Sequence, residues 1–282
     1  MTDRVRRPLL SGLGFAEGPR WHDGRLWFSD MGAARVMAVD LDGRAEEMVT
    51  VPNRPSGLGW LPDGRLLIVS MADRRVLRLD AGRLEVHADL SGLVSFDCND
   101  MVVDGRGRAY VGNAGFDMRE RPVRPRPTQL VLVTPEGEAR AVDDQLVFPN
   151  GAVIDAHGRT LVVAETFGQR LTAFTIVEDG SLTDRRTFAD LPGHAPDGIC
   201  LDAEGAVWFA DATGQACFRV REGGEVVDRV DTGRGCFACA LGGENRRILF
   251  LLTADAYSGA AIRSRTGAVE MVDVEVPGAG WP

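Results

Sequence analysis

The chain has 282 residues, of which 44% are hydrophobic and 26% are charged, and its formal net charge is −9. This composition is that of a globular protein, and the negative charge disfavours a nucleic-acid partner, which needs clustered Lys and Arg side chains. No segment approaches the roughly 18 apolar residues of a membrane span, and residues 1–12 lack the apolar core of a signal peptide. We therefore expect a cytoplasmic protein, monomeric or dimeric, that binds a small-molecule substrate and neither a membrane nor a nucleic acid.

A repeated pattern runs along the chain, in which a polar residue precedes a short apolar strand, a tight turn and a second apolar strand. The repeats begin, in chain order, at Glu17, Ser56, Asn99, Asn150, Asp197 and Cys236. Their second strands are centred, at steps of 40, 43, 52, 46 and 42 residues, on Trp27, Leu67, Tyr110, Val162, Trp208 and Phe250. A spacing of this size is typical of the four-stranded blades of a β-propeller.

The sequence therefore predicts an all-β fold, a six-bladed β-propeller with four antiparallel strands per blade, that forms a single domain over residues 1–282. Asp-Gly, Glu-Gly and His-Gly pairs supply the positive φ angles that tight hairpins need. Residues 36–40 and 76–80 have the composition of third strands. Closing the ring requires one strand from a terminus, and we expect residues 5–10 to join the last blade near residues 269–276.

The longest step contains residues 116–127, which are rich in Arg and Pro and fit no strand. Two interpretations remain open for this segment. It is either a solvated surface loop or a lid that presents an arginine to an anionic substrate. In the second interpretation Phe116, Arg119 and Arg121 contact the substrate.

The first residue of each repeat enters the innermost strand of its blade, so these six positions surround the mouth of the central channel. We call them the ring positions. Four of them carry side-chain oxygen atoms, namely Glu17, Asn99, Asn150 and Asp197. Asn-Gly and Asp-Gly pairs also form turns on their own, but the common offset in the blades favours a metal site. Oxygen ligands select a hard cation, and we expect one divalent ion, Ca²⁺ ahead of Mn²⁺, Zn²⁺ or Mg²⁺.

Three motifs resemble those of the senescence marker protein, gluconolactonase and luciferin-regenerating enzyme family. They are Phe-Ala-Glu-Gly-Pro-Arg-Trp at residues 15–21, Phe-Pro-Asn-Gly at residues 148–151 and Ala-Pro-Asp-Gly-Ile-Cys-Leu-Asp at residues 195–202. Residues 239–243 resemble the last-blade motif of the family. The resemblance implies a six-bladed propeller and metal-dependent lactone hydrolysis. It also implies metal ligation by Glu17, Asn150 and Asp197, and a substrate-side role for Asn99, which Asp100 follows.

One departure from the family concerns the substrate. Sugar-lactonase members carry an Arg two residues before the substrate-side Asn, whereas this chain has Asp97 there. A carboxylate cannot donate a hydrogen bond to an oxygen-rich substrate, so an aldonolactone is in question although lactone hydrolysis is not. A bound metal would polarise the lactone carbonyl and lower the pKa of a water molecule. Asp197 would then serve as the general base, and Asn99 would orient the substrate or complete the metal shell.

Further polar residues lie near the ring positions in sequence. The second strands return to the same mouth, so we expect the carboxylates at their ends, Asp30, Glu165 and Asp211, to support the ring from behind. His194, three residues before Asp197, is a candidate for substrate binding. Residues 236 and 239 form a lone Cys-x-x-Cys pair, a pattern that here favours buried thiols over zinc.

Two other functions remain open. The same metal site is compatible with aryl-ester or phosphotriester hydrolysis, or with a non-hydrolytic conversion of a natural product, because a fold alone does not decide the chemistry. In the third interpretation the propeller is a non-catalytic ligand-binding scaffold whose Ca²⁺ only stabilises the channel.

Overall fold

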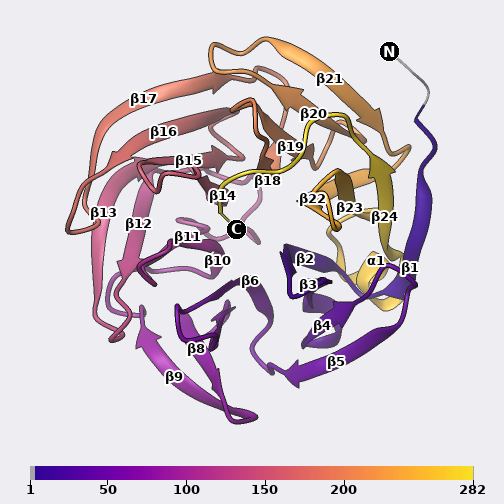
Figure 1. Ribbon diagram of the computed structural model, residues 1–282. Coiled ribbons are helices and arrows are strands. Elements are labelled where there is room, and N and C mark those ends of the chain that lie inside the picture. Colours follow the sequence, from indigo (N-terminus) through magenta and orange to yellow (C-terminus); the bar gives the residue numbers. More distant parts are fainter. Residues whose placement is uncertain (1–3, 282) are drawn as a thin grey trace.

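The structure is a computed structural model that describes residues 4–281. Its strands form six four-stranded antiparallel sheets around a central axis, the arrangement of a six-bladed β-propeller (Figure 1). The predicted fold class and the predicted number of blades are therefore confirmed. The innermost strands of the blades are, in chain order, β2 (Ala16–His22), β6 (Pro55–Trp60), β10 (Cys98–Val103), β14 (Pro149–Ile154), β18 (Pro196–Leu201) and β22 (Gly235–Gly242).

Each innermost strand is followed outward by three more strands. The second strands are β3 (Arg25–Asp30), β7 (Leu66–Ser70), β11 (Ala109–Asn113), β15 (Thr160–Glu165), β19 (Val207–Asp211) and β23 (Ile248–Ala254). The third strands are β4 (Arg35–Val39), β8 (Arg75–Asp80), β12 (Thr128–Val133), β16 (Arg170–Ile176), β20 (Ala216–Val220) and β24 (Gly267–Asp273). The outermost strands are β5 (Ala45–Thr50), β9 (Arg83–Asp89), β13 (Ala139–Leu146), β17 (Leu182–Asp190), β21 (Val226–Asp231) and β1 (Arg7–Leu13).

The sixth blade joins the two ends of the chain. Strand β1 pairs antiparallel with β24, from Arg7 opposite Met271 to Leu13 opposite Gly267. This confirms that an N-terminal strand closes the propeller on the last blade, and the pairing begins two residues later than the sequence predicts. The segments that carry the first and the last blade are thereby fixed to one another.

The core lies between neighbouring blades, which cover both faces of each sheet. Strand β7, for example, is buried along its whole length and is apolar at four of its five positions. Such continuous apolar composition is expected when both faces of a strand are covered. Near the axis the innermost strands approach very closely. A Cβ atom on Gly151 would lie 2.6 Å from the backbone nitrogen of Ile199, so this position in β14 requires glycine.

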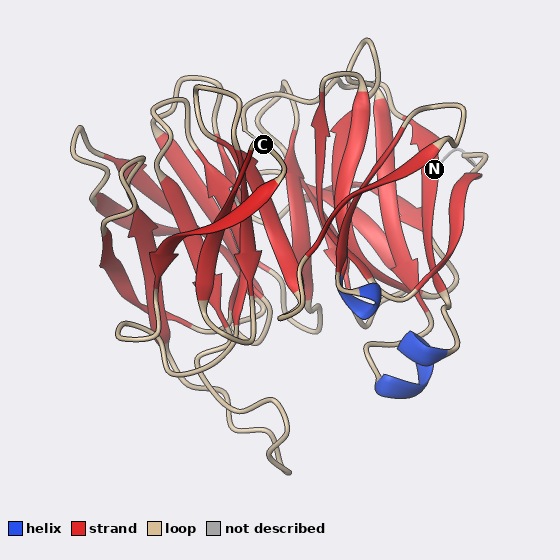
Figure 2. Ribbon diagram, turned by 90° about the horizontal axis from the view of Figure 1, so that it is seen from below, coloured by secondary structure: helices blue, strands red, loops and turns tan. Residues whose placement is uncertain are grey.

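The two ends of the central channel differ. At one end the last described residues cross blades four and five, where Ile154 pairs with Trp281 and Asp202 pairs with Gly278; the yellow part of the ribbon accordingly runs toward the centre in Figure 1. At the other end, where the innermost strands begin, the long loop of residues 114–127 projects from the same side as α1 (Gly259–Arg263) and the 3₁₀ turn η1 (Met31–Ala33) (Figure 2). The ring positions lie at this second end.

No helix within residues 4–281 combines the length and the apolar character that crossing a bilayer requires.

Candidate functional site

The ring positions share one structural setting. Each is the second residue of its innermost strand, so the common offset predicted from the repeats is confirmed. In all six blades the pairing of the innermost strand with the second strand shifts register at or directly after this residue. A β-bulge of this kind bends the strand and redirects the local side chain. The fold therefore presents these six side chains at equivalent points of the mouth.

Glu17 and Asp197 are both buried at the ring. Burial raises the pKa of Glu17 well above its ordinary value, and the negative charges of Asp197 and Asp100 raise it further. Burial likewise raises the pKa of Asp197; a hydrogen bond with Asn150 acts in the opposite direction, and the charge of Asp100 adds to the increase. The structure thus brings together two carboxylates that are 180 residues apart in sequence, in an environment that penalises their charged forms.

The two amide side chains of the predicted ligand set are held by neighbouring hydroxyls. Nδ2 of Asn150 donates to Oγ1 of Thr166 at 3.1 Å, and that hydroxyl donates to the carbonyl oxygen of Pro196 at 2.8 Å. Oγ of Ser56 donates to Oδ1 of Asn99 at 3.4 Å. The hydrogen bond to Thr166 identifies which end of the Asn150 amide is the donor, so its oxygen remains an acceptor for a cation or a substrate.

A buried ion pair lies directly beside the ring, and the sequence did not reveal it. Nη2 of Arg20, in β2, donates to Oδ1 of Asp100, in β10, at 2.8 Å. Nε of Arg20 also donates to the carbonyl oxygen of Leu58 in the intervening strand β6 at 3.0 Å. Burial raises the pKa of Asp100, and the charge of Arg20 opposes that shift. One guanidinium therefore connects three innermost strands and neutralises one of three buried carboxylates.

The remaining charges of the ring suit a cation. Within residues 4–281 no ion pair involves Glu17 or Asp197, whereas Asp100 has Arg20. Two like charges buried without a partner are unfavourable, and a divalent cation between them removes the penalty. Within the same residues no group of three or more His, Cys, Asp or Glu side chains has an arrangement that could hold a metal ion. A cation at the ring would thus depend on the oxygen atoms of Asn99 and Asn150 in addition to the two carboxylates.

Three carboxylates at the ends of second strands pair with the first residues of innermost strands, and they accept hydrogen bonds from backbone rather than from ring side chains. We call Asp30, Glu165 and Asp211 the strand-end carboxylates, and the side chain of each is 0% exposed. Oδ1 of Asp30 accepts hydrogen bonds from the backbone nitrogens of Gly14 at 2.9 Å and Phe15 at 3.0 Å. The segment that leads into the Glu17 position is held in this way.

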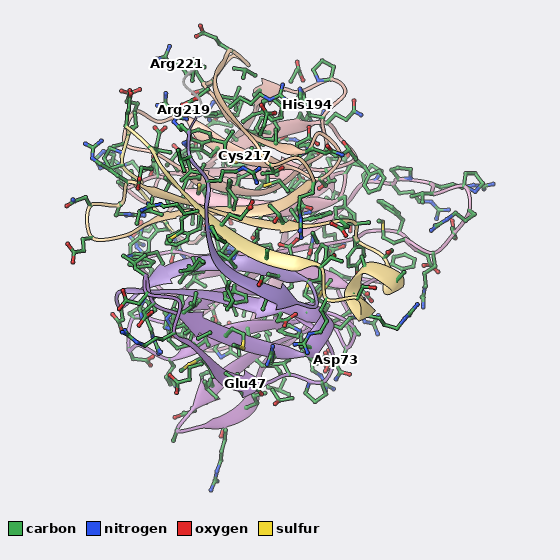
Figure 3. All side chains as sticks on the ribbon, turned by 90° about the vertical axis from the view of Figure 1, so that its right-hand side faces the viewer. Glu47, Asp73, His194, Cys217, Arg219 and Arg221 are labelled. Atoms are coloured by element: carbon green, nitrogen blue, oxygen red, sulfur yellow. The ribbon has the colours of Figure 1, made fainter. Side chains whose placement is uncertain are left out.

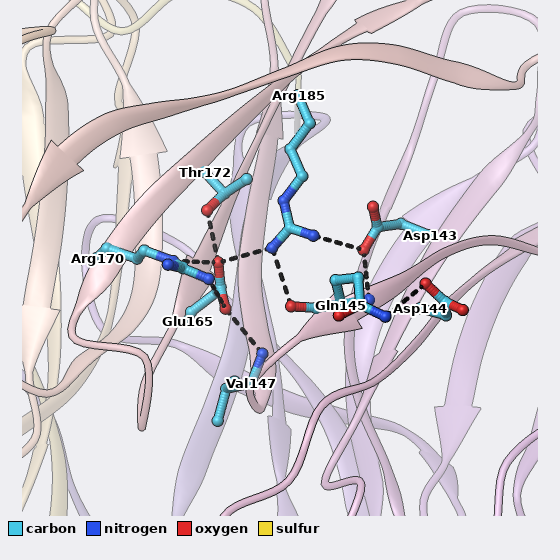
Figure 4. Close-up of polar contacts among 8 residues, drawn as sticks. All are labelled: Asp143, Asp144, Gln145, Val147, Glu165, Arg170, Thr172 and Arg185. Carbon is cyan, nitrogen blue, oxygen red and sulfur yellow. Dashed lines mark hydrogen bonds and ion pairs between the residues drawn. The ribbon is translucent and has the colours of Figure 1, made fainter.

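Glu165 acts in the same manner on the segment that leads into Asn150. Its Oε2 accepts a hydrogen bond from the backbone nitrogen of Val147 at 2.7 Å, and its Oε1 pairs with Nε of Arg170 at 2.7 Å (Figure 4). Figure 4 also shows Thr172 and Arg185 directed at the same carboxylate. The corresponding strand ends of blades two, three and six are occupied by neutral residues, Ser70, Asn113 and Ala254. The acidic strand ends thus occur in the three blades that carry Glu17, Asn150 and Asp197.

His194 is joined to Asp211 rather than to the ring. Its Nδ1 lies 2.6 Å from Oδ2 of Asp211, and its ring packs edge-on against Phe218 at 4.7 Å; Figure 3 labels it. Oδ1 of Asp211 accepts a hydrogen bond from the backbone nitrogen of Ala195 at 3.2 Å, two residues before Asp197. Burial opposes ionisation of Asp211, but the hydrogen bonds from His194 and from the backbone outweigh it and lower the pKa of this carboxyl. His194 therefore supports the segment before Asp197.

The Arg- and Pro-rich segment forms no strand, as expected. Its two predicted substrate-binding arginines bond within their own loop; Asp117 raises the pKa of Arg119, and the charge of Asp97 adds to that increase. Arg119 is 89% exposed and pairs with Asp117 at 3.0 Å, and Arg121 donates to carbonyl oxygens of its own loop. Phe116, in contrast, is buried and packs against Phe148 and Phe167, with ring centroids 5.8 and 5.2 Å away. The base of the loop is thus an aromatic cluster beside the Asn150 position.

Asp97 does not stand alone at the mouth. It forms an ion pair with Arg54, and Nη1 of Arg54 donates to the phenol oxygen of Tyr257 at 3.4 Å. The partial burial of Tyr257 raises the pKa of its phenol; Arg54 acts against this shift, and the charges of Asp97 and Glu17 add to it. Arg54 and Asp97 each stand two residues before a ring position, but the sequence gives no signal that their side chains meet or that Tyr257 joins them from a third loop.

All five cysteines are free and buried. Sγ of Cys200 lies 3.7 Å from Sγ of Cys239, in the packed interface between blades five and six that also contains Cys217. Figure 3 labels Cys217 on this side of the molecule. Cys236 occupies the ring position of blade six and packs in the same apolar cluster. The favoured interpretation of the Cys-x-x-Cys pair, buried thiols, agrees with this arrangement.

Comparison with known proteins agrees with the motifs. The family model described as SMP-30/Gluconolactonase/LRE-like region matches residues 15–255. The chain belongs to this family. The match extends from the residue before β2 to the residue after β23, so all six ring positions fall within the SMP-30/gluconolactonase/LRE-like region.

Individual relatives are distant but extend over most of the chain. A 6-deoxy-6-sulfogluconolactonase from Pseudomonas putida is 25% identical over 295 aligned residues, which cover 99% of this chain and 96% of the relative. A pentonolactonase from Haloferax volcanii is 24% identical over 256 residues, with 89% and 85% covered. Among solved structures, a calcium-binding protein, regucalcin, from Agrobacterium tumefaciens has a TM-score of 0.83 at 23% identity and covers 99% of this chain and 97% of its own. This last similarity shows the fold.

Proposed function

We propose that this protein is a divalent-metal-dependent hydrolase that opens a lactone, with the metal held at the ring by Glu17, Asn99, Asn150 and Asp197. The observation that carries the proposal is the pair of buried carboxylates, Glu17 and Asp197, which have no ion-pair partner within residues 4–281. Such a pair is unfavourable in a protein interior unless a cation joins it. Two relatives that align with most of the chain are lactonases, and this supports the choice of reaction.

The ligand set favours Ca²⁺. Carboxylate and amide oxygens are hard ligands, and Ca²⁺ accepts such ligands in flexible arrangements. The calcium-binding regucalcin with the same fold supports this choice. Mn²⁺, Mg²⁺ and Zn²⁺ are the alternatives that an experiment must compare, because affinity for a given site rises along the transition series irrespective of the biological metal.

The chemistry divides between the cation and the residues of this chain. When bound, the metal supplies a Lewis acid for the lactone carbonyl and a water molecule of lowered pKa. A side-chain oxygen of Asp197 would take a proton from the attacking water and return it to the ring oxygen when the bond between the carbonyl carbon and the ring oxygen breaks. Asn99 binds and orients the substrate through its amide, and the nearby hydroxyl of Ser56 holds that amide.

The experiment is a lactone panel assayed by acid release after the protein has been stripped with EDTA. Addition of Ca²⁺, Mn²⁺, Mg²⁺ or Zn²⁺ should restore turnover of at least one lactone. The variants Glu17→Gln and Asp197→Asn should lower kcat/KM by about 100- to 10,000-fold, the range of a lost general base. Glu47→Gln, which changes an exposed carboxylate on β5, should leave it unchanged.

If no lactone is hydrolysed with any of the four cations, the proposal is wrong. Aryl esters and phosphotriesters tested on the same protein would then distinguish another hydrolase from a non-catalytic scaffold. Full activity of the EDTA-treated protein would show that lactone hydrolysis does not require a metal, and the proposed lactonase activity would stand.

A further inference from the structure

Arg54, Asp97 and Tyr257 meet at the mouth although they come from three different loops. Arg54 precedes β6, Asp97 precedes β10, and Tyr257 follows β23. One Nη atom of Arg54 pairs with Oδ2 of Asp97, and the other donates to the phenol oxygen of Tyr257 at 3.4 Å. The side chains of Arg54 and Asp97 are 39% and 43% exposed, so the pair is accessible to a ligand.

The cluster lies next to the ring. Arg54 and Asp97 each stand two residues before a ring position, Ser56 and Asn99, whose side chains are hydrogen-bonded to each other at 3.4 Å. The ring of Tyr257 packs edge-on against Phe15 at 5.0 Å, and Phe15 lies two residues before Glu17. A substrate held at the ring would therefore have this cluster beside it on the side of blades one, two and three.

The backbone holds Arg54 in an unfavourable conformation. Its φ angle is +65°, in the left-handed region that non-glycine residues avoid, and Pro55 follows it. Its carbonyl oxygen accepts a hydrogen bond from the backbone nitrogen of Met71 at 2.9 Å. The backbone hydrogen bond to Met71 and the ion pair with Asp97 thus both hold Arg54 at the mouth.

We propose that Arg54 is a specificity-determining residue for the lactone of the proposed function, and that it selects a neutral lactone rich in hydroxyl groups. The guanidinium has five N–H groups, and those not used by Asp97 and Tyr257 can donate to hydroxyl oxygens. Asp97 can accept hydrogen bonds from the same hydroxyls. Because guanidinium and carboxylate together are neutral, the pair matches groups that both donate and accept better than it matches an anion.

This assignment changes the meaning of Asp97. Taken alone, a carboxylate at this position argues against an oxygen-rich substrate. With Arg54 bound to it, Asp97 instead holds a donor at the mouth, so the site is suited to a hydroxylated lactone such as an aldonolactone. The inference rests on the proposed function for the identity of the ligand, and it concerns recognition rather than the chemical step.

The test compares Arg54→Met with Arg75→Met in the full chain. Arg75 is a matched control in the same blade, since its side chain is 41% exposed and it forms a surface ion pair with Asp89 at 3.3 Å. The first measurement is the Kd of a neutral sugar lactam, whose amide is not cleaved, by calorimetric titration of the Ca²⁺-loaded protein. Loss of a charge-assisted hydrogen bond at a recognition site should weaken binding about 10- to 100-fold in Arg54→Met. Arg75→Met should bind as the wild type does.

The second measurement is the ratio of kcat/KM for a hydroxylated δ-lactone to that for the unsubstituted δ-lactone, and Arg54→Met should lower this ratio by a similar factor. The reciprocal variant Arg54→Asp with Asp97→Arg keeps both groups and should recover most of the lactam affinity. An unchanged Kd and ratio in Arg54→Met, or tighter binding of a carboxylate-bearing lactam than of the neutral one, would overturn the inference. If no lactone reacts but the lactam still binds and Arg54→Met weakens that binding, the proposed hydrolase activity is wrong while the role of Arg54 in recognition stands.

Discussion

Replacement of Asp211 by Asn tests whether the strand-end carboxylates position the metal ligands. Oδ1 of Asp211 accepts hydrogen bonds from the backbone nitrogens of Ala195, Thr213 and Gly214 at 3.2, 3.0 and 2.9 Å. An amide oxygen can still accept these bonds, but each weakens by about 1 kcal/mol when the acceptor loses its charge. The total of about 3 kcal/mol corresponds to a fall in Tm of roughly 6–12 °C for a protein of about this length.

The distinguishing readout is metal affinity. Ala195 stands two residues before Asp197, so loosening its contact should displace the ligand and weaken Ca²⁺ binding by about tenfold, as is usual when groups that orient metal ligands are removed. Calorimetric titration of Ca²⁺ into the EDTA-treated variant measures this directly. Ser70→Ala is the matched control, because Ser70 ends the second strand of a blade without a predicted ligand. If Asp211→Asn loses stability but binds Ca²⁺ with wild-type affinity, the strand-end carboxylates stabilise the fold alone.

Three further predictions concern the ring and its surroundings. Arg20→Met should lower the free energy of unfolding, measured in urea titrations, by about 3–5 kcal/mol because it leaves Asp100 buried without its partner. Adding Asp100→Asn should restore much of that loss. Equal stability of the single and the double variant would contradict this prediction. The second prediction compares the wild type with the Glu17→Gln, Asp197→Asn double variant in EDTA. The wild type should lose stability relative to the variant as the pH rises from about 4 to 8. The reason is that the pKa values of Glu17 and Asp197 are raised in the folded state, which therefore binds more protons than the unfolded state in this range. Thermal unfolding at several pH values measures the difference, and a constant difference would refute the account. Gly151→Ala should cost about 1–3 kcal/mol, because the new Cβ would lie 2.6 Å from a backbone nitrogen of β18; an unchanged Tm would show that the innermost strands can separate freely.

The blade architecture was predictable because it is repeated. Tight turns and apolar strands recur at a nearly constant interval, and the recurrence fixes both the number of blades and the offset of the polar residue that begins each one. That offset placed Glu17 and Asp197 at equivalent points although 180 residues separate them, and the structure confirms the equivalence. Closure by an N-terminal strand followed from the same count, because the last repeat lacks its outermost strand.

The contacts between blades were not predictable in the same way. Arg20 reaches Asp100 across an intervening strand, and Arg54 reaches Asp97 from a separate loop. Arg54 and Asp97 share one blade offset, but neither ion pair follows from spacing alone, since each depends on how side chains from different blades are directed at the mouth. The strand-end carboxylates are an intermediate case: their place behind the ring followed from the strand order, but their hydrogen bonds to the backbone of the preceding loop did not.

The central claim is that two buried carboxylates at the ring hold a divalent cation, and Ca²⁺ titration into EDTA-treated protein tests it most directly. We expect one site per chain in the wild type and no measurable binding in Glu17→Gln or Asp197→Asn. Cys236→Ser, at a ring position outside the predicted ligand set, should retain the site. Binding of equal affinity in Glu17→Gln, or the absence of a site for Ca²⁺, Mn²⁺, Mg²⁺ and Zn²⁺ in the folded wild type, would contradict the account.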